Sequence, residues 1–418
     1  MRIKVPHFSL VILIGPNSSG KSTFAERHFQ NSEIVSLDYC RYLISDAPKE
    51  TLATAKAYEL MNEIIDKRLS MKKLTVVDAP NVLKHQRLEL LNLANLHHAL
   101  TVAIVLNLPK EVIIANNRSN DFPIDDNIIN YQLHQLELSL PNLKQEGFNS
   151  VYIINSVEEL MKTEITQAPL FCDKQTESGP FDIIGDIHGC FDELVLLLKK
   201  LGYVIEDYHV THPEGRKVVF VGDLVDRGPK SVEVLKLVMG MVKDGLAFCV
   251  QGNHDNKLYR MLSGHNVIVN HGLELTRQEL DQATETFRND VKEFLKDLPT
   301  HVILDYGKLV VAHAGIKEEY IGRHSKEIKA FTLYGDTTKE LDEWGLPERR
   351  LWSNDYKGNA LIIYGHTPNL EPVMINNTIN IDTGCVFGNK LTAYRYPEGE
   401  FVFVEALQKY ASYPRPLR

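Results

Sequence analysis

The sequence Leu10-Val11-Ile12-Leu13-Ile14 runs directly into Gly15-Pro16-Asn17-Ser18-Ser19-Gly20-Lys21-Ser22 near the start of the chain. The first five residues are apolar and mostly branched, which predicts a buried β-strand. The next eight fit the pattern G-x-x-x-x-G-K-S/T, in which backbone N–H groups turn inward around phosphate oxygens. Residues 23–29 then predict a helix whose N-terminus completes the anion site. A strand, a glycine-rich loop and a helix in this order predict a layered α/β domain with a parallel sheet.

This loop predicts a nucleotide site. Lys21 is expected to reach the β- and γ-phosphates of ATP, and Ser22 is expected to hold Mg²⁺. The residues predicted to contact the nucleotide are Gly15, Ser18, Ser19, Gly20, Lys21, Ser22 and Thr23. A plain glycine- and serine-rich turn is the competing interpretation, but a match at all eight positions between a strand and a helix favours a phosphate site.

The acceptor of the phosphate is harder to predict. Asp38 and Arg41 follow the next apolar run, so Asp38 could take a proton from an attacking hydroxyl while Arg41 clamps an acceptor phosphate. A helix-capping aspartate beside a solvated arginine is an equally good interpretation. Asp78 ends another predicted strand and is expected near Mg²⁺ or its water, although it could be a plain loop residue.

The organisation of the chain predicts two domains. Apolar runs alternate with helical stretches up to residue 168, which is typical of a parallel sheet covered by helices. Proline, glycine and polar residues cluster at 169–180 and predict a linker, so the expected domains are 1–168 and 181–418. In the second domain short apolar runs each end in a polar cluster, and the helical stretch at about 276–296 predicts a lid or a structural insert.

Composition excludes several classes of protein. The 418 residues carry 46 Lys+Arg against 55 Asp+Glu, a net charge of −9, which argues against coating duplex DNA. No apolar run is long enough to span a bilayer and no signal peptide is visible, so a cytoplasmic protein without membrane contact is expected. Five scattered cysteines without a C-x-x-C pair predict reduced thiols.

The second domain carries five polar clusters, each at the end of a predicted strand. They are Gly185-Asp186-Ile187-His188-Gly189, Gly222-Asp223-Leu224-Val225-Asp226-Arg227-Gly228, Gly252-Asn253-His254-Asp255, His313, and Gly365-His366-Thr367. Each histidine alone would more often be a surface or core residue. Their ordered occurrence with aspartates and an asparagine predicts hard oxygen and imidazole ligands on one rim.

These ligands predict a pair of divalent cations. Asp186, His188 and Asp223 are expected to hold one cation, and Asp223, Asn253, His313 and His366 the other, with Asp223 as the bridge. His254 stands beside a ligand and is expected to protonate a leaving alkoxide, with Asp226 orienting its ring and Arg227 neutralising phosphate oxygens. Asp382 could support the rim or lie in an ordinary turn.

The second domain therefore resembles the calcineurin-like metallophosphoesterases, which include protein phosphatases and diadenosine tetraphosphatases. With the upstream phosphate-binding loop, the whole chain resembles the bacterial polynucleotide kinase-phosphatase of RNA end repair. The motifs that carry this resemblance are residues 36–41, 77–81, 179–189 and 380–388.

The resemblance implies two activities. The first domain would phosphorylate 5′-OH polynucleotide ends with ATP and Mg²⁺, with Asp38 as base, Arg41 as phosphate clamp and Arg118 as lid arginine. The second would remove 2′,3′-cyclic, 2′- or 3′-phosphates with two divalent ions, Mn²⁺ being expected. The implied partners are RNA or DNA ends, a separate RNA ligase, an RNA 3′-terminal ribose methyltransferase and a second copy of the chain.

Two departures and one rival interpretation accompany this resemblance. The family protein usually continues into a ligase-like domain, whereas this sequence stops at Arg418, and its lid tends to carry a second arginine, whereas Asp121 follows Arg118 here. We expect Asp121 to pair with Arg118 when no nucleotide is bound. The rival function is a Ser/Thr protein or dinucleoside-polyphosphate phosphatase whose phosphate-binding loop senses a nucleotide. A mere sensor does not need Asp38 and Arg41, and a pure RNA-binding scaffold does not need the catalytic sets.

Overall fold

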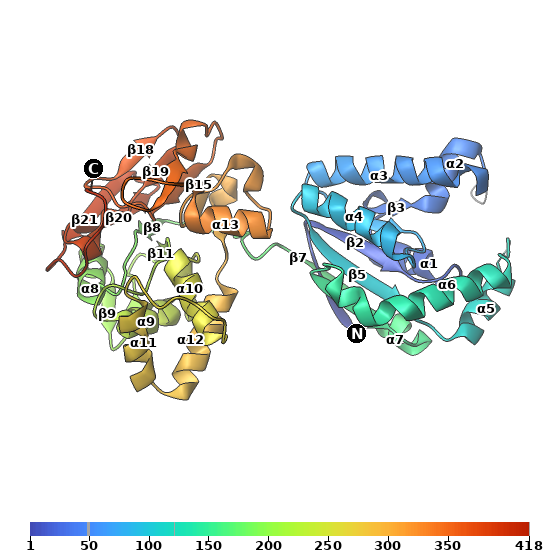
Figure 1. The fold of residues 1–418 in the computed structure, drawn as a ribbon, viewed down its shortest axis with the longest axis horizontal. Coiled ribbons are helices and arrows are strands. Elements are labelled where there is room, and N and C mark those ends of the chain that lie inside the picture. The colour runs from blue at the N-terminus through green and yellow to red at the C-terminus, as the bar shows by residue number, and fades with distance from the viewer. Residues whose placement is uncertain (48–50, 121, 418) are drawn as a thin grey trace. The chain divides into compact units, whose positions relative to one another are not determined.

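The computed structural model describes residues 1–47, 51–120 and 122–417. The chain divides into two compact units, the first comprising residues 1–170 with 323–325 and the second comprising 171–322 with 326–418 (Figure 1). The predicted linker, 169–180, contains no helix or strand in the structure, and the unit boundary lies within it. No helix among the described residues is long and apolar enough to cross a membrane.

The first unit is built on an entirely parallel five-stranded sheet. Its strand order is β3 (Ile34–Ser36), β4 (Thr75–Asp78), β2 (Ser9–Ile14), β5 (Leu100–Leu106) and β6 (Ser150–Ile154). A separate parallel pair joins β1 (Arg2–Pro6) to β7 (Glu164–Ala168). The helices are α1 (Lys21–His28), α2 (Leu37–Ser45), α3 (Thr54–Ser70), α4 (Lys84–Leu96), α5 (Lys110–Arg118), α6 (Asp126–Ser139) and α7 (Val157–Lys162).

The central strand β2 is buried on both faces, as its unbroken apolar run predicts. Leu10, Ile12 and Ile14 face the core that includes residues of α3 and α4, whereas Val11 and Leu13 face the core that includes residues of α1. Helices therefore cover both faces of the sheet, and all five strands point their carboxyl ends to one edge. The parallel-sheet α/β domain predicted from the sequence is present.

The second unit is a sandwich of two five-stranded sheets. One sheet has the order β12 (Ala247–Cys249), β11 (Lys217–Phe220), β8 (Phe181–Ile184), β20 (Lys390–Tyr396) and β21 (Glu400–Glu405). The other has the order β13 (His301–Leu304), β14 (Leu309–Ala312), β17 (Leu361–Tyr364), β19 (Thr378–Asn380) and β18 (Val373–Ile375). Two hairpins join β9 (Val204–Glu206) to β10 (His209–Thr211) and β15 (Asp336–Leu341) to β16 (Pro347–Arg350).

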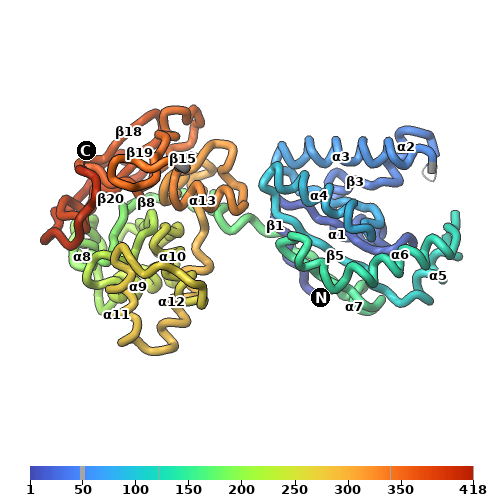
Figure 2. Tube along the Cα trace, viewed as in Figure 1, coloured from blue at the N-terminus to red at the C-terminus, as the bar shows by residue number. Residues whose placement is uncertain are grey.

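Helices cover the sandwich, and Figure 2 follows them along the chain from green to orange. They are α8 (Phe191–Lys200), α9 (Ser231–Lys243), α10 (Asn253–Leu262), α11 (Leu273–Gln282), α12 (Glu285–Asp297) and α13 (Lys326–Tyr334). The helical stretch expected at about 276–296 is two helices, because α11 ends at Gln282 and Thr284 caps α12 through its side chain. Both belong to the insert, and Leu280 and Val291 anchor them in the core.

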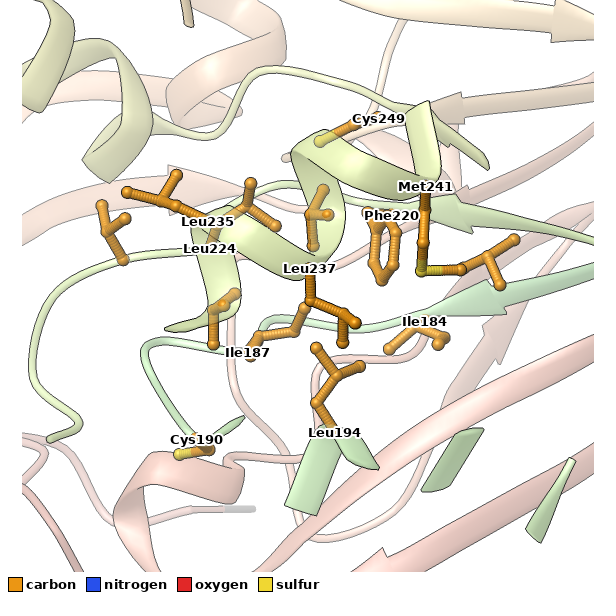
Figure 3. Close-up of a cluster of buried hydrophobic side chains, with 14 of the residues drawn as sticks. Ile184, Ile187, Cys190, Leu194, Phe220, Leu224, Leu235, Leu237, Met241 and Cys249 are labelled. Atoms are coloured by element: carbon orange, nitrogen blue, oxygen red, sulfur yellow. The ribbon is translucent and has the colours of Figure 1, made fainter. Parts of the chain in front are cut away.

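Side chains that alternate along the strands fill the sandwich. Ile183 of β8 belongs to the core shared by both sheets, whereas its neighbour Ile184 faces the helices. Figure 3 shows Ile184 and Phe220 from the sheet beside Leu235, Leu237 and Met241 of α9. This packing fixes the strand ends, from which the loops of the second unit's site emerge.

Candidate metal centre and phosphate-binding loop

The predicted phosphate-binding loop lies between β2 and α1. Gly20 precedes the helix in a left-handed conformation, with φ 90°, so α1 begins at Lys21. A Cβ on Gly15 would lie 2.8 Å from the Ser19 hydroxyl, which explains the need for glycine there. The Lys21 ammonium donates to the carbonyl of Pro16 at 2.7 Å and thereby closes the loop.

A cavity of about 530 Å³ opens in front of this loop. Of the predicted contact residues, Ser18, Gly20, Lys21, Ser22 and Thr23 line the cavity. Gly15 and Ser19 do not line it, because both are buried within the loop. The volume is in the range of a nucleotide-sized ligand.

Two acidic residues line the same cavity, Asp38 and Asp78. Burial raises the pKa of Asp78, while Lys21 and a hydrogen bond from Ser22 oppose that rise. Ser36 and not Asp38 caps α2, since the Ser36 hydroxyl accepts the N–H of Tyr39. Asp38 therefore does not act as the helix cap; it lies on the cavity, and its role as base stays a prediction.

Neither of the two arginines predicted for this site lines the cavity. Arg41 forms an ion pair with Asp38 and donates to the Thr54 hydroxyl at 3.3 Å, and it does not line the cavity. The side chain of Arg118 is 73% exposed and its Nη2 lies 3.6 Å from an oxygen of Asp126. The predicted pairing of Arg118 with Asp121 falls on a residue outside the described ranges. Arg27, which the sequence did not single out, does line the cavity.

The predicted metal ligands of the second unit follow strands of both sheets. Asp186 and His188 follow β8, Asp223 follows β11, Asn253 follows β12, His313 follows β14 and His366 follows β17. Glycines permit the close approach of these loops, because a Cβ on Gly252 would collide with Asp223 and one on Gly365 with Asp186. The structure therefore brings the predicted ligands together where the two sheets meet.

The backbone at this centre is strained. Five non-glycine residues of the site have left-handed φ angles of 47° to 75°, namely His188, Asp223, Asp226, Arg227 and His366. Such conformations cost free energy and cluster at functional sites, where the surrounding fold enforces them.

Asp223 occupies the middle of the cluster. Its Oδ2 lies 3.4 Å from Nε2 of His188 and also 3.4 Å from Nε2 of His313. Two groups of side chains, His188–Asp223–His254 and Asp223–His313–His366, each place their ligand atoms within 4.8 Å of one another. One carboxylate shared by two groups is the arrangement predicted for a bridging ligand.

Hydrogen bonds fix the tautomers of the imidazoles. Nδ1 of His188 donates to the carbonyl of Val225 at 2.9 Å and Nδ1 of His313 to that of Val221 at 3.0 Å, so both rings present Nε2 to the cluster. The asparagine oxygen of Asn253 lies 3.0 Å from Nε2 of His313. Nε2 of His366 is buried without a hydrogen-bond partner among the described residues.

Burial shifts the protonation of these groups. It raises the pKa of Asp223 to about 7 and lowers the pKa of His313 to about 3. Burial also lowers the pKa of His188 and of His366, with the guanidinium groups of Arg227 and Arg349 as second causes. Neutral imidazoles beside closely spaced carboxylates fit divalent cations, whose charge would stabilise the ionised aspartates. Cations bound here would activate a water and neutralise phosphate charge.

The membership of Asp186 in the ligand set stays a prediction. His254, predicted as a leaving-group acid, belongs to the first group of ligand atoms, and Asp186 does not. The Asp186 carboxylate instead accepts the backbone N–H of His366 at 3.1 Å. Burial and the nearby Asp382 raise the pKa of Asp186, and a cation bound beside it would favour its ionised form.

His254 is held by a chain of polar contacts. Its Nδ1 lies 2.7 Å from Oδ2 of Asp226, and the hydroxyl of Thr276 donates to Oδ1 of the same carboxylate at 2.7 Å. Arg227 donates from Nη2 to Nε2 of His254 at 3.2 Å and stacks over Phe387. Thr276 comes from the α11–α12 insert, which explains why sequence motifs did not reveal it.

Asp382 and Arg349 complete the rim. Asp382 lines the cavity of about 540 Å³ at the metal centre, and burial raises its pKa to about 7. The carboxylate also accepts the N–H of Gly384 at 3.0 Å, so it both supports the rim and forms a turn. Arg349 lines the same cavity but lies in a hairpin without any motif, and sequence reasoning missed it.

Comparison with known families accounts for both units. The sequence profile described as calcineurin-like phosphoesterase matches residues 179–403. The chain belongs to the calcineurin-like phosphoesterase family. A profile described as AAA domain matches residues 10–137, which include the phosphate-binding loop. The predicted order of a P-loop domain before a metallophosphoesterase is thus confirmed, and so is a metallophosphoesterase that uses divalent metals.

Individual relatives resemble part of the chain. A bis(5′-nucleosyl)-tetraphosphatase PrpE (asymmetrical) of Anoxybacillus flavithermus is 53% identical over 236 residues, 56% of this chain and 96% of the relative. The protein of that name from Bacillus subtilis is 51% identical over 234 residues, 55% of this chain and 96% of the relative. A solved cold-active protein tyrosine phosphatase of Shewanella is 17% identical with a TM-score of 0.36, covering 56% of this chain and 82% of its own. That last likeness is too distant to carry an argument.

Proposed function

We propose that the phosphoesterase unit hydrolyses dinucleoside tetraphosphates asymmetrically. Each reaction consumes one water and releases one nucleoside triphosphate and one nucleoside monophosphate. The observation that carries the proposal is the 53% identity, over 96% of its length, to a relative named for this activity. This identity favours the dinucleoside-polyphosphate phosphatase, the alternative predicted from the sequence, over RNA end repair.

The geometry of the metal centre supports the proposal. The metal-ligand cluster faces a cavity of about 540 Å³, large enough for part of a dinucleotide. Arg227 lies beside His254 and can move from that ring to a phosphate oxygen when substrate arrives. Freed of Arg227, His254 can deliver a proton to the leaving phosphate, with Asp226 steadying the imidazolium.

A second candidate concerns the first unit. We infer that it binds ATP with Mg²⁺ and transfers a phosphoryl group to a hydroxyl, because Asp38 lines the same cavity as Lys21 and Asp78. A polynucleotide 5′-OH would be the acceptor if the chain heals RNA ends. The second unit would then remove 2′,3′-cyclic, 2′- or 3′-phosphates with a metal such as Mn²⁺, and a ligase acting in trans would seal the ends.

Product analysis tests the main proposal. The purified chain, with Mn²⁺ or Mg²⁺, should convert a dinucleoside tetraphosphate into equal amounts of nucleoside triphosphate and monophosphate, resolved by anion-exchange chromatography. Asp223→Ala should yield neither product. Formation of two nucleoside diphosphates, or turnover no faster than that of nitrophenyl phosphate, would overturn the asymmetric function.

A further inference from the structure

Arg349 is a half-buried cation that forms no ion pair with a carboxylate among the described residues. It lies on β16, opposite Thr337 of β15, and its neighbours Glu348 and Arg350 are exposed while its own side chain turns inward. Nη1 donates to the hydroxyl of Thr367 at 3.1 Å, directly after the ligand His366. Nε is buried and has no hydrogen-bond partner among the described residues.

The buried arginines Arg87 and Arg216 are each neutralised. Arg87 pairs with Glu146 at 2.7 Å, and Arg216 pairs with Asp182 at 2.9 Å and with Glu398 at 2.6 Å. Among the described residues no carboxylate lies within ion-pair distance of Arg349. Burial lowers its pKa, while Tyr413, which also hydrogen-bonds to it, and the more distant Asp382 oppose that shift. A guanidinium stays protonated in proteins, so an unpaired one in a cavity wall is poised for an anionic ligand.

The position of Arg349 divides the space around the metal centre. It lines the cavity that contains Arg227, His254 and Asp223, and it also lines an adjoining cavity of about 520 Å³ that contains none of these three. His366 and Tyr413 border both cavities as well. A chain of phosphates leaving the metal centre in this direction therefore passes Arg349.

The adjoining cavity has the lining expected for a nucleoside. Its aromatic residues include Tyr334, Trp344, Trp352, Tyr364 and Tyr413. Trp344 lies in the turn of the same hairpin that carries Arg349 and is 37% exposed. The hairpin is tied to the C-terminal segment by Arg415, whose Nε donates to Asp342 at 2.7 Å. Trp344 and Tyr334, 37% and 42% exposed, offer aromatic faces for stacking with a nucleobase, whereas Trp352 and Tyr364 are buried in the wall.

We propose that Arg349 binds a phosphate next to the scissile one, and that the adjoining cavity receives the nucleoside at the end of that phosphate chain. This inference rests on the proposed function, because it gives the dinucleoside substrate its second binding subsite. Arg349 is here a specificity-determining residue, whereas Arg227 serves the phosphate that is cleaved. A substrate with a single phosphate reaches Arg227 and leaves Arg349 unused.

The test compares substrates in one variant. Arg349→Met keeps the length of the side chain but removes its charge and donors. We expect kcat/KM for a dinucleoside tetraphosphate to fall about 10- to 100-fold, chiefly through KM, the range expected for losing a charge-assisted hydrogen bond. For nitrophenyl phosphate it should stay within about twofold. Arg349→Lys should recover part of the loss. Arg277→Met, which removes an exposed arginine of α11 paired with Asp281, is the matched control and should change neither substrate.

Two results would overturn the inference. Equal losses on both substrates would place Arg349 at the scissile phosphate, and an unchanged KM for the tetraphosphate would remove it from binding. A separate measurement tests the phosphate subsite independently of the proposed function. Inorganic tripolyphosphate should inhibit nitrophenyl phosphate hydrolysis about 10-fold more weakly in Arg349→Met than in the wild type, with free metal held constant. If the wild type fails to cleave the tetraphosphate but this difference remains, the function is wrong and the polyphosphate subsite stands. An unchanged inhibition constant would refute the subsite itself.

Discussion

The loop between β2 and α1 would meet a phosphate with backbone amides and one lysine, whereas the strand ends of the second unit present carboxylates and imidazoles. The loop is one continuous stretch of eight residues, 15–22. The metal centre gathers side chains from Asp186 to His366, over strands of two sheets. The first site therefore depends on local conformation, and the second depends on the whole sandwich being folded.

Charge separates the two sites further. The nucleotide cavity contains Lys21 beside the acidic groups Asp38 and Asp78. In the metal centre, burial raises the pKa of Asp223 and Asp226 to about 7, and a cation beside Asp223 would favour its ionised form. Removing metals should accordingly change the stability of the second unit. The phosphate-binding loop, whose charged group is Lys21, should be unaffected.

The largest expected effect is a separation of activities, because the two sites share no residue. Asp223→Ala removes the carboxylate common to both ligand groups and should lower phosphoesterase kcat/KM by about 10⁴-fold or more. Phosphoryl transfer from ATP to a 5′-OH oligonucleotide should persist in that variant. Lys21→Ala should do the reverse. Loss of both activities in either folded variant, judged by circular dichroism, would contradict independent sites.

The variant His254→Ala tests whether the imidazole beside Asp223 is a proton donor or a metal ligand. If His254 donates a proton to the leaving group, rates on dinucleoside tetraphosphates and alkyl esters should fall about 10²- to 10⁴-fold, and rates on nitrophenyl phosphate should fall less. Metal content, measured by mass spectrometry, should stay near that of the wild type. Loss of one metal per chain would make His254 a ligand instead, as its place in the first ligand group allows.

The stability of the metal-free protein should depend on pH in a defined direction. Asp223 and Asp226 have folded pKa values of about 7, above the unfolded value near 4, so their contribution to stability is lost as pH rises through 7. The buried histidines, whose pKa values are lowered, lose their contribution only as pH falls below about 6.5. The melting temperature of chelator-treated protein should therefore increase from pH 8 to pH 6.5.

A variant identifies the group responsible. Asp223→Asn should flatten this slope, because the amide does not titrate. Saturating Mn²⁺ should raise the melting temperature of the wild type most at pH 8, where the free carboxylates repel one another. A metal-free melting temperature that decreases over the same interval would contradict the assignment of the raised pKa values.

The smallest effect is expected from removing Asp126, the partner of Arg118. Its ion pair with Asp126 is solvent-exposed, and such pairs contribute about 0–1 kcal/mol. Asp126→Ala should free the arginine and improve the apparent ATP affinity by at most about fivefold. Arg118→Ala should cripple phosphoryl transfer if the arginine closes over the nucleotide. Unchanged kinase kinetics in both variants would show that the lid arginine lies elsewhere, with Arg27 on the cavity wall as the next residue to test.

Sequence reasoning reached those parts of the molecule that local patterns encode. The apolar runs at 10–14, 181–184 and 217–221 coincide with strands, and the glycine motifs that follow them lie where a Cβ would collide. Strands β18 and β19 were not predicted, since such three-residue strands carry too short a pattern.

Side-chain partners across long distances escaped prediction for a physical reason. Three such partners depend on how separate elements pack. Thr276 contacts Asp226, Arg349 lines a cavity, and Arg118 lies beside Asp126. No spacing in the sequence encodes them. The ligands that motifs predicted were brought together, and the spacing of His254 from His188 and Asp223 required the structure.

Competition between two substrates tests the central claim most directly. The wild-type chain would be given a dinucleoside tetraphosphate and an RNA oligomer with a 2′,3′-cyclic phosphate in one mixture, with Mn²⁺, and the loss of each would be followed by chromatography. The proposed function predicts that the tetraphosphate is consumed first, with a kcat/KM at least about 10²-fold higher, and that it yields triphosphate and monophosphate. Preferential opening and removal of the cyclic phosphate, with the tetraphosphate left intact, would contradict it and restore RNA end repair as the function.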